Sequence, residues 1–145
     1  MSLPKPFAGL VIRYSFLWHA DAARGMEEGS KDRPCAVVLV TVEEDGAQFV
    51  TVLPVTHSPP RDHNLAVEIP RDTKKRLGLD DERLWVVVTD ANRFIWPGPD
   101  LRFTQANTPS SVAYGSLPMH IYDEVRIKFI AAAKARMVGQ VTRTE

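Results

Sequence analysis

The chain has 145 residues, of which 44% are hydrophobic and 25% charged, so it can bury one substantial core and lacks the composition typical of disordered proteins. Its 18 basic and 18 acidic side chains balance, which excludes a general electrostatic attraction to nucleic acid or to an anionic membrane. A single cysteine excludes an internal disulfide, and neither a signal-peptide pattern nor a bilayer-spanning apolar segment is visible, so we expect one cytoplasmic domain over residues 1–145 with no membrane partner.

The first predicted strand runs from Gly9 to about Trp18, after an extended lead-in that contains two prolines. From His19 to Asp32 the sequence changes to small and charged residues with two glycines, which predicts a long mobile loop. Such a loop between paired strands is often functional. A solvated insertion without contacts is an equally good interpretation.

The central stretch of the chain is the apolar run that begins at Cys35, which predicts a strand buried on both faces with Arg33-Pro34 at its mouth. Residues 49–56 predict a second strand, and the acidic turn ending in Gly46 predicts a hairpin between the two. Antiparallel pairing brings the start of one strand beside the end of the next, so we expect Arg33 to lie near Thr56. Cys35 is expected to be a packed thiol rather than a reactive one.

Two shorter elements follow the predicted hairpin. Leu65–Pro70 predicts a third strand, and Asp72–Gly78 predicts a short helix with a capping aspartate at its start and a glycine at its end. The dense basic cluster of the chain starts just before this helix and continues within it, and consists of Arg71, Lys74, Lys75 and Arg76. Such a cluster can bind phosphates, but the zero net charge favours a solvated helix face.

The last part of the chain predicts further strands and a long helix. Leu84–Trp96 predicts two strands in succession, closed by the turn Pro97-Gly98-Pro99. Residues 103–112 predict a loop, with a short pairing segment near Val112–Gly115. A helix from about Leu117 to Met137, with Pro118 in its first turn, closes the chain. Its predicted apolar stripe consists of Ile121, Val125, Phe129, Ala132 and Ala133.

Five or six short strands with tight turns and one closing helix indicate a mainly β protein with α, and specifically a small SH3-like β-barrel with a C-terminal helix. Within it, an opening strand over Gly9–Phe16, the Arg33-Pro34 step before a buried strand, and a Pro54-Val55-Thr56 ending occur in order, with Thr56 23 residues after Arg33. This combination, which spans most of the chain, resembles the PemK/MazF-type toxin family.

The resemblance implies a fold, an activity and partners. The fold is the same SH3-like barrel. The activity is that of the toxin of a type II toxin-antitoxin system, a metal-independent endoribonuclease that cuts single-stranded RNA and needs no cofactor. The partners are the RNA, a second copy of the chain in a homodimer, and an antitoxin protein that covers the active groove.

The reaction that the resemblance implies needs three things: a deprotonated 2′-hydroxyl, a positive charge beside the crowded phosphorane, and a proton for the leaving 5′-oxygen. Arg33 matches the family's arginine and is the expected phosphate clamp, with proton donation as a further possible role. Thr56 matches the family's threonine, whose hydroxyl holds a phosphate oxygen or orients the base. The alternatives are an ion pair of Arg33 with Asp32 or a loop carboxylate, and a turn hydroxyl of Thr56 bonded to its own backbone.

Asp90 is the third expected catalytic residue, because some PemK-type members carry a carboxylate proposed as the base at this point. Those members have an arginine two residues before the carboxylate, where this chain has Val88, so the pair is not intact. Arg93 is a candidate to replace that arginine in space, and it is expected with Asn92 to contact substrate. The alternative for Asp90 is a strand-end aspartate that caps the next turn.

Two histidines complete the expected substrate-binding residues. His57 follows Thr56 directly, and His19 lies at the rim of the long loop. Either can act as acid or base near neutral pH, although a loop histidine is more often an ordinary surface residue. A metal site built from His57, His63 and Asp62 is disfavoured because the spacing lacks a second ligand pair, so we expect no metal.

Functions of other classes remain open. A non-catalytic SH3-like barrel that binds a peptide or nucleic acid is the main alternative. The zero net charge, Val88 and the long charged loop favour this alternative, whereas Arg33 together with Thr56 favours the enzyme. A structural dimerisation module that uses the apolar helix face is a third possibility.

Overall fold

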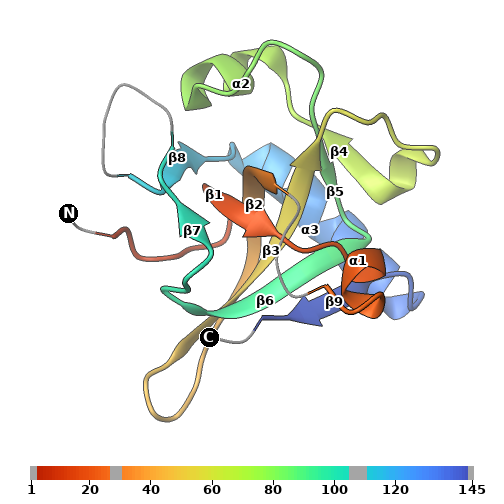
Figure 1. Cartoon of the computed structure of the whole chain (residues 1–145). Coiled ribbons are helices and arrows are strands. Elements are labelled where there is room, and N and C mark those ends of the chain that lie inside the picture. Colours follow the sequence, from red (N-terminus) through yellow and green to blue (C-terminus); the bar gives the residue numbers. More distant parts are fainter. Residues whose placement is uncertain (1–2, 27–30, 105–110, 144–145) are drawn as a thin grey trace.

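The computed structural model describes residues 3–26, 31–104 and 111–143. They form a mainly β protein in which nine strands build one strongly curled sheet, nearly all of it antiparallel, accompanied by three helices and one short 3-10 turn (Figure 1). The strands are β1 (Leu10–Phe16), β2 (Lys31–Val42), β3 (Gln48–Thr56), β4 (Ala66–Glu68), β5 (Trp85–Val87), β6 (Asp90–Trp96), β7 (Leu101–Arg102), β8 (Ala113–Ser116) and β9 (Gly139–Thr142). The helices are α1 (His19–Ala23), α2 (Arg71–Leu77) and α3 (Met119–Lys134), and the turn is η1 (His63–Leu65).

The centre of the sheet is the meander β1–β2–β3, as the sequence predicts. Strand β2 is buried on both faces, because Cys35 and Val37 pack into one apolar cluster while Ala36 and Val38 pack into another. The strand begins at Lys31, so the prediction that Arg33-Pro34 forms its mouth is wrong: both residues are already paired with β1. The additional pairing arises because the long strand β1 continues beside β2 as far as Phe16 opposite Lys31.

Strand β3 changes neighbours along its length, and this bend positions the site. Its first half, from Gln48 to Val52, pairs with β6, whereas its end, Val55 and Thr56, pairs with β5. β5 and β6 are separated only by a bend at residues 88–89. At the end of β3, β5 and then β4 therefore take the place of β6 in the sheet, and β4 contacts α3 (Figure 1).

Two apolar clusters lie on opposite faces of the curled sheet. The cluster inside the curl is centred on Tyr14 and Phe94, whose rings stack with centroids 4.6 Å apart. The other cluster lies under α3, which contributes Ile121, Val125 and Ala132. The predicted helix stripe is confirmed at these three positions and at the partly buried Phe129, but Ala133 is exposed.

The predicted helices exist with shifted starts. α2 begins at Arg71 with Pro70 in the capping position and no side-chain cap, so the predicted cap by Asp72 is wrong, while Gly78 ends the helix in the left-handed region with φ 75° as predicted. α3 likewise begins after Pro118, which lies in the capping position rather than in the first turn. No helix of the described residues is long and apolar enough to cross a membrane.

The basic cluster of α2 is not simply a solvated face. Lys74 is buried, and its ammonium group donates to the backbone oxygens of Asp81 and Glu82 at 3.2 and 2.7 Å. Arg76 donates to the backbone oxygen of Ser116 at 2.6 Å. Two of the four basic side chains therefore hold neighbouring loops in place, which the sequence pattern did not predict.

Apart from the short turn η1, one helix and two strands were not predicted from the sequence. The predicted loop from His19 begins with the short helix α1, and its residues 27–30 lie outside the described part of the chain. Strand β7 pairs with β1. The helix α3, which was expected to be the last element, is followed by strand β9. This strand runs parallel to β6, with Asp90 opposite Gly139. Since β9 is only four residues long and half exposed, periodicity gave no signal for it.

Candidate functional site

A cleft of about 690 Å³ opens where β2 begins and β3 ends. Cys35 of β2 is paired with Pro54 of β3, so the antiparallel register brings Arg33 and Thr56 to the same end of the hairpin. Both residues line the cleft together with His57 and Trp18. The structure thus assembles three of the seven expected site residues in one place.

Arg33 has an unusual environment for an arginine. Its Nη1 donates one long bond of 3.5 Å to the backbone oxygen of Val55, and its guanidinium lies over the Trp18 ring at 5.0 Å from the centroid. Its buried Nε has no hydrogen-bond partner among the described residues. Partial burial lowers the pKa of Arg33, although an arginine keeps its charge at any relevant pH. The buried Nε is not accessible from the cleft, but apart from the Nη1 bond the guanidinium forms no hydrogen bond with the described residues, so its outer N–H groups remain free to donate.

The alternative of an ion pair with Asp32 is not what the geometry favours. Asp32 is instead 3.9 Å from Arg13 and 3.6 Å from Arg102. None of the ion pairs formed by the described residues includes Arg33. Of the loop carboxylates that were the other alternative, Asp21 pairs with Arg24, and Glu27 and Glu28 lie outside the described residues. Among the described residues, the half-buried guanidinium therefore has no carboxylate partner, and a charged group in such a place needs solvent or a ligand to satisfy it.

Thr56 has the turn role that its sequence position allows, and its hydroxyl keeps a donor. Its Oγ1 accepts a hydrogen bond from the Ser58 N–H at 3.2 Å, which is the turn role expected of a threonine at a strand end. A hydroxyl that accepts in this way still has its own proton to donate. Thr56 can therefore hold the turn and donate to a phosphate oxygen in the cleft.

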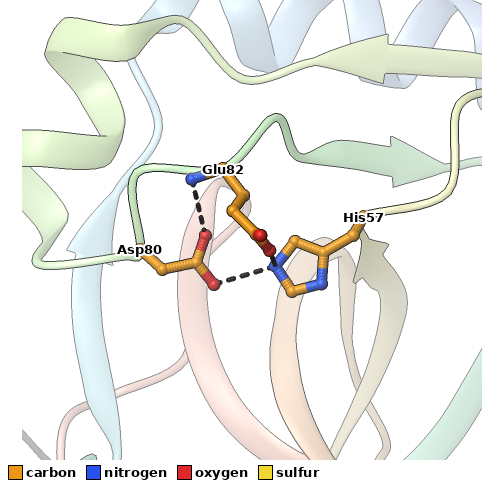
Figure 2. A group of neighbouring side chains, drawn as sticks. All are labelled: His57, Asp80 and Glu82. Carbon is orange, nitrogen blue, oxygen red and sulfur yellow. Dashed lines mark hydrogen bonds and ion pairs between the residues drawn. The ribbon is translucent and has the colours of Figure 1, made fainter.

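His57 faces two carboxylates that the sequence analysis did not connect with it. Its Nε2 lies 2.8 Å from Asp80 Oδ2 and 3.3 Å from Glu82 Oε2, and both carboxylates come from the loop between α2 and β5 (Figure 2). Asp80 is itself held in place, because its Oδ1 accepts the Glu82 N–H at 3.0 Å. The acidic run after Gly78 marks a polar turn in the sequence, but no spacing pattern joins it to a residue more than 20 positions earlier.

Among the described residues, the same three side chains form a group that could hold a metal ion. Their ligand atoms lie within 4.8 Å of one another, and all three residues are exposed. The metal set considered from the sequence is different: Asp62 accepts the Asn64 N–H at 2.9 Å and thereby caps η1. A hydrogen bond from the imidazole to Asp80 accounts for the observed geometry without an ion.

Asp90 and His19 lie in a second, smaller hollow of about 330 Å³, which shares Trp18 with the cleft. Asp90 Oδ1 accepts the His19 N–H at 3.1 Å, so the carboxylate holds the start of α1. Burial raises the pKa of Asp90 above its usual value. The ring of His19 packs on Gly139, where an added Cβ would come within 2.6 Å of it. These contacts give both residues structural roles.

Asn92 and Arg93 line neither hollow. Asn92 is fully buried: its Oδ1 accepts the Leu17 N–H at 2.9 Å, and its Nδ2 donates to the Leu17 oxygen at 2.7 Å. Arg93 lies over the Phe49 ring at 3.9 Å and near Glu43 at 3.7 Å, on the hairpin side of β6. Arg93 therefore does not replace the arginine that is missing at position 88, where this chain has a valine.

The cleft carries charges of both signs. Arg13, Lys31 and Arg33 contribute positive charge, and Asp32 and Asp80 contribute negative charge. The lining therefore has a small excess of positive charge, although the net charge of the chain is zero.

Comparison with known proteins adds no family. No family model matches the chain, and a search of curated proteins finds no match.

Proposed function

We propose that the chain is the toxin of a type II toxin-antitoxin system, a PemK/MazF-like endoribonuclease that cuts single-stranded RNA without a metal ion. The observation that carries this proposal is the half-buried guanidinium of Arg33, which has unused donors and shares a cleft with Thr56. These are the two residues that the family resemblance singles out. The curled antiparallel sheet with α3 against one face supports an SH3-like barrel.

Arg33 is proposed to bind the scissile phosphate. Its planar fork pairs with two phosphate oxygens, and it stabilises the additional charge of the phosphorane. Because the guanidinium is partly buried and stacked on Trp18, its position is set before the substrate arrives and solvent screens it less. Thr56 donates its hydroxyl to another phosphate oxygen. Asp90, in the second hollow, is given no step in this mechanism.

The proposed antitoxin and the proposed homodimer are both implied by the family resemblance. An antitoxin segment that covers the cleft would place a carboxylate on Arg33, the group that lacks an ion-pair partner among the described residues. The mass of the protein in solution, measured by light scattering, tests for the second copy of the chain.

The experiment is cleavage of an unstructured RNA by the purified protein in excess chelator. Wild type is expected to leave a 5′-hydroxyl and a cyclic or 3′-phosphate. Arg33→Ala is expected to lower the single-turnover rate by roughly 100-fold or more, as loss of a charge-stabilising donor does elsewhere. Arg33→Lys is expected to restore little, because lysine keeps the charge without the fork.

Arg83→Ala is the matched control. Arg83 is also stacked on a tryptophan, with its guanidinium 4.9 Å from the Trp85 ring, but it pairs with Glu68 and does not line the cleft. Equal loss in both variants would show that stacking and stability, not the cleft, set the rate. If wild type cuts none of the RNAs tested, the proposed ribonuclease activity is wrong.

A non-catalytic barrel is the second candidate. The mixed charges of the cleft and the use of the Thr56 hydroxyl in its own turn favour it. Its signature is binding of RNA or of an acidic peptide that weakens in Arg33→Ala, with no product formed at any time.

A further inference from the structure

We propose that His57, oriented by Asp80, is the group that accepts the proton of the attacking 2′-hydroxyl. This inference rests on the proposed ribonuclease and names its proton acceptor. His57 follows Thr56 directly and lines the same cleft as Arg33, whereas Asp90 lies in the second hollow. The site then contains a phosphate clamp and a base within one cleft.

The contact with Asp80 decides which nitrogen of His57 carries the proton. An ionised carboxylate only accepts hydrogen bonds, so the Nε2 that lies 2.8 Å from Asp80 Oδ2 is the protonated one. The other nitrogen, Nδ1, then has a free lone pair. Figure 2 shows Nδ1 on the side of the ring away from both carboxylates. No hydrogen bond to it is formed by the described residues.

Asp80, rather than Glu82, is the positioning residue. Asp80 is the nearer of the two, and the Glu82 N–H fixes its second oxygen. The Glu82 side chain is 75% exposed and its oxygen lies at 3.3 Å, so solvent weakens its contact. The arrangement is that of a base held in one tautomer by one carboxylate.

The chemical step balances without any further reagent. The 2′-O–H proton moves to Nδ1, the 2′-oxygen bonds to phosphorus, and the P–O5′ bond breaks. The departing 5′-oxygen takes a proton from water, and the imidazolium of His57 returns its own proton to solvent. The products are a 2′,3′-cyclic phosphate and a 5′-hydroxyl. While the imidazole is protonated, Asp80 stabilises its charge.

The test compares His57→Ala, Asp80→Asn and Glu82→Gln in single-turnover cleavage with excess chelator. General base catalysis contributes about 100-fold or more, so His57→Ala should lose that much, and added imidazole should restore part of it. Asp80→Asn should lose roughly 10-fold, because an amide also stabilises the wrong tautomer. Glu82→Gln should change the rate less than about 3-fold. His63→Ala, which removes another exposed histidine outside the cleft, should leave the rate unchanged.

The pH profile gives a readout that a structural role would not move. A histidine base must be neutral, so the rate of wild type should rise between about pH 5 and 8, and this rise should be absent in His57→Ala. The other charged groups that line the cleft are Arg13, Lys31, Asp32, Arg33 and Asp80.

The outcomes separate the two proposals. If wild type cuts and Arg33→Ala does not, but His57→Ala keeps the wild-type rate and pH profile, His57 is not the base and the ribonuclease stands. If His57→Ala loses activity, imidazole does not restore it and the rate still rises with pH, His57 is not the base and its role is structural. If wild type never cuts, the proposed function fails and this inference fails with it.

Discussion

At the scale of single residues, Asp90 shows how burial opposes charge. Burial raises its pKa above the usual value, and the His19 N–H only partly compensates. The folded protein therefore binds this proton more tightly than the unfolded chain does. Stability contributed by the protonated form is lost as the pH rises from the usual pKa of an aspartate to the raised one.

Asp90→Asn tests this linkage. Asparagine keeps an oxygen for the His19 N–H but has no charge to bury. We expect the variant to gain stability relative to wild type as the pH rises through that window, and the difference to level off above it. Urea unfolding at a series of pH values measures the free energy of unfolding of both proteins. A difference that does not change with pH would contradict the role of burial.

Cys35 is a second group whose burial favours its neutral form. It is fully buried, and burial raises the pKa of its thiol far above the usual range. The prediction from sequence that this thiol is packed is confirmed. We expect a thiol reagent to modify native protein at least 100-fold more slowly than protein unfolded in guanidinium, because only the exposed thiolate reacts. Equal rates in the two states would show that β1–β2 opens readily.

At the scale of elements, the missed strand β9 brings a buried charge into the curl of the sheet. Arg143, directly after β9, donates to the Ser15 oxygen at 2.8 Å and to Asn92 Oδ1 at 3.1 Å. Its guanidinium is also 3.1 Å from Asp100. One side chain thereby ties the C-terminal strand to β1, β6 and the turn before β7.

Arg143→Met should destabilise the protein by about 3 kcal/mol, because it keeps most of the apolar stem but leaves Asp100 without its partner in a mostly buried setting. Chemical denaturation monitored by tryptophan fluorescence measures the change. Arg126→Met, on the exposed face of α3, is the matched control and should stay within about 0.5 kcal/mol. A similar small effect at Arg143 would mean that β9 contributes little to the fold.

At the scale of the whole molecule, zero net charge limits how RNA can bind. Three basic side chains, Arg13, Lys31 and Arg33, line the cleft. If each neutralises one phosphate of a single strand, the slope of log K against log salt is about −2, which weakens binding roughly 20-fold between 50 and 200 mM salt. Fluorescence polarisation with a labelled, 2′-O-methylated RNA that cannot be cut measures this slope. A slope near zero would exclude phosphate binding in the cleft, and one steeper than about −4 would require contacts outside it.

Much of the architecture followed from local patterns in the sequence. The apolar run of β2, the acidic turn and the β3 run determined the central hairpin, because burial on both faces and tight turns leave strong local signals. The same register placed Arg33 and Thr56 in one cleft, since antiparallel pairing fixes which strand ends meet. The stripe on α3 likewise predicted most of the face that it buries.

Only the tertiary structure decided what these residues meet. His57 contacts Asp80, and Asn92 is buried against Leu17; each of these contacts links elements far apart in the chain. Asp90, by contrast, lies in a different hollow from Arg33. The tertiary structure also added β9, a half-exposed strand that exists because the edge of β6 offers it backbone partners. Sequence periodicity records which face of an element is buried, but not which partner covers it, and the site depends on the partners.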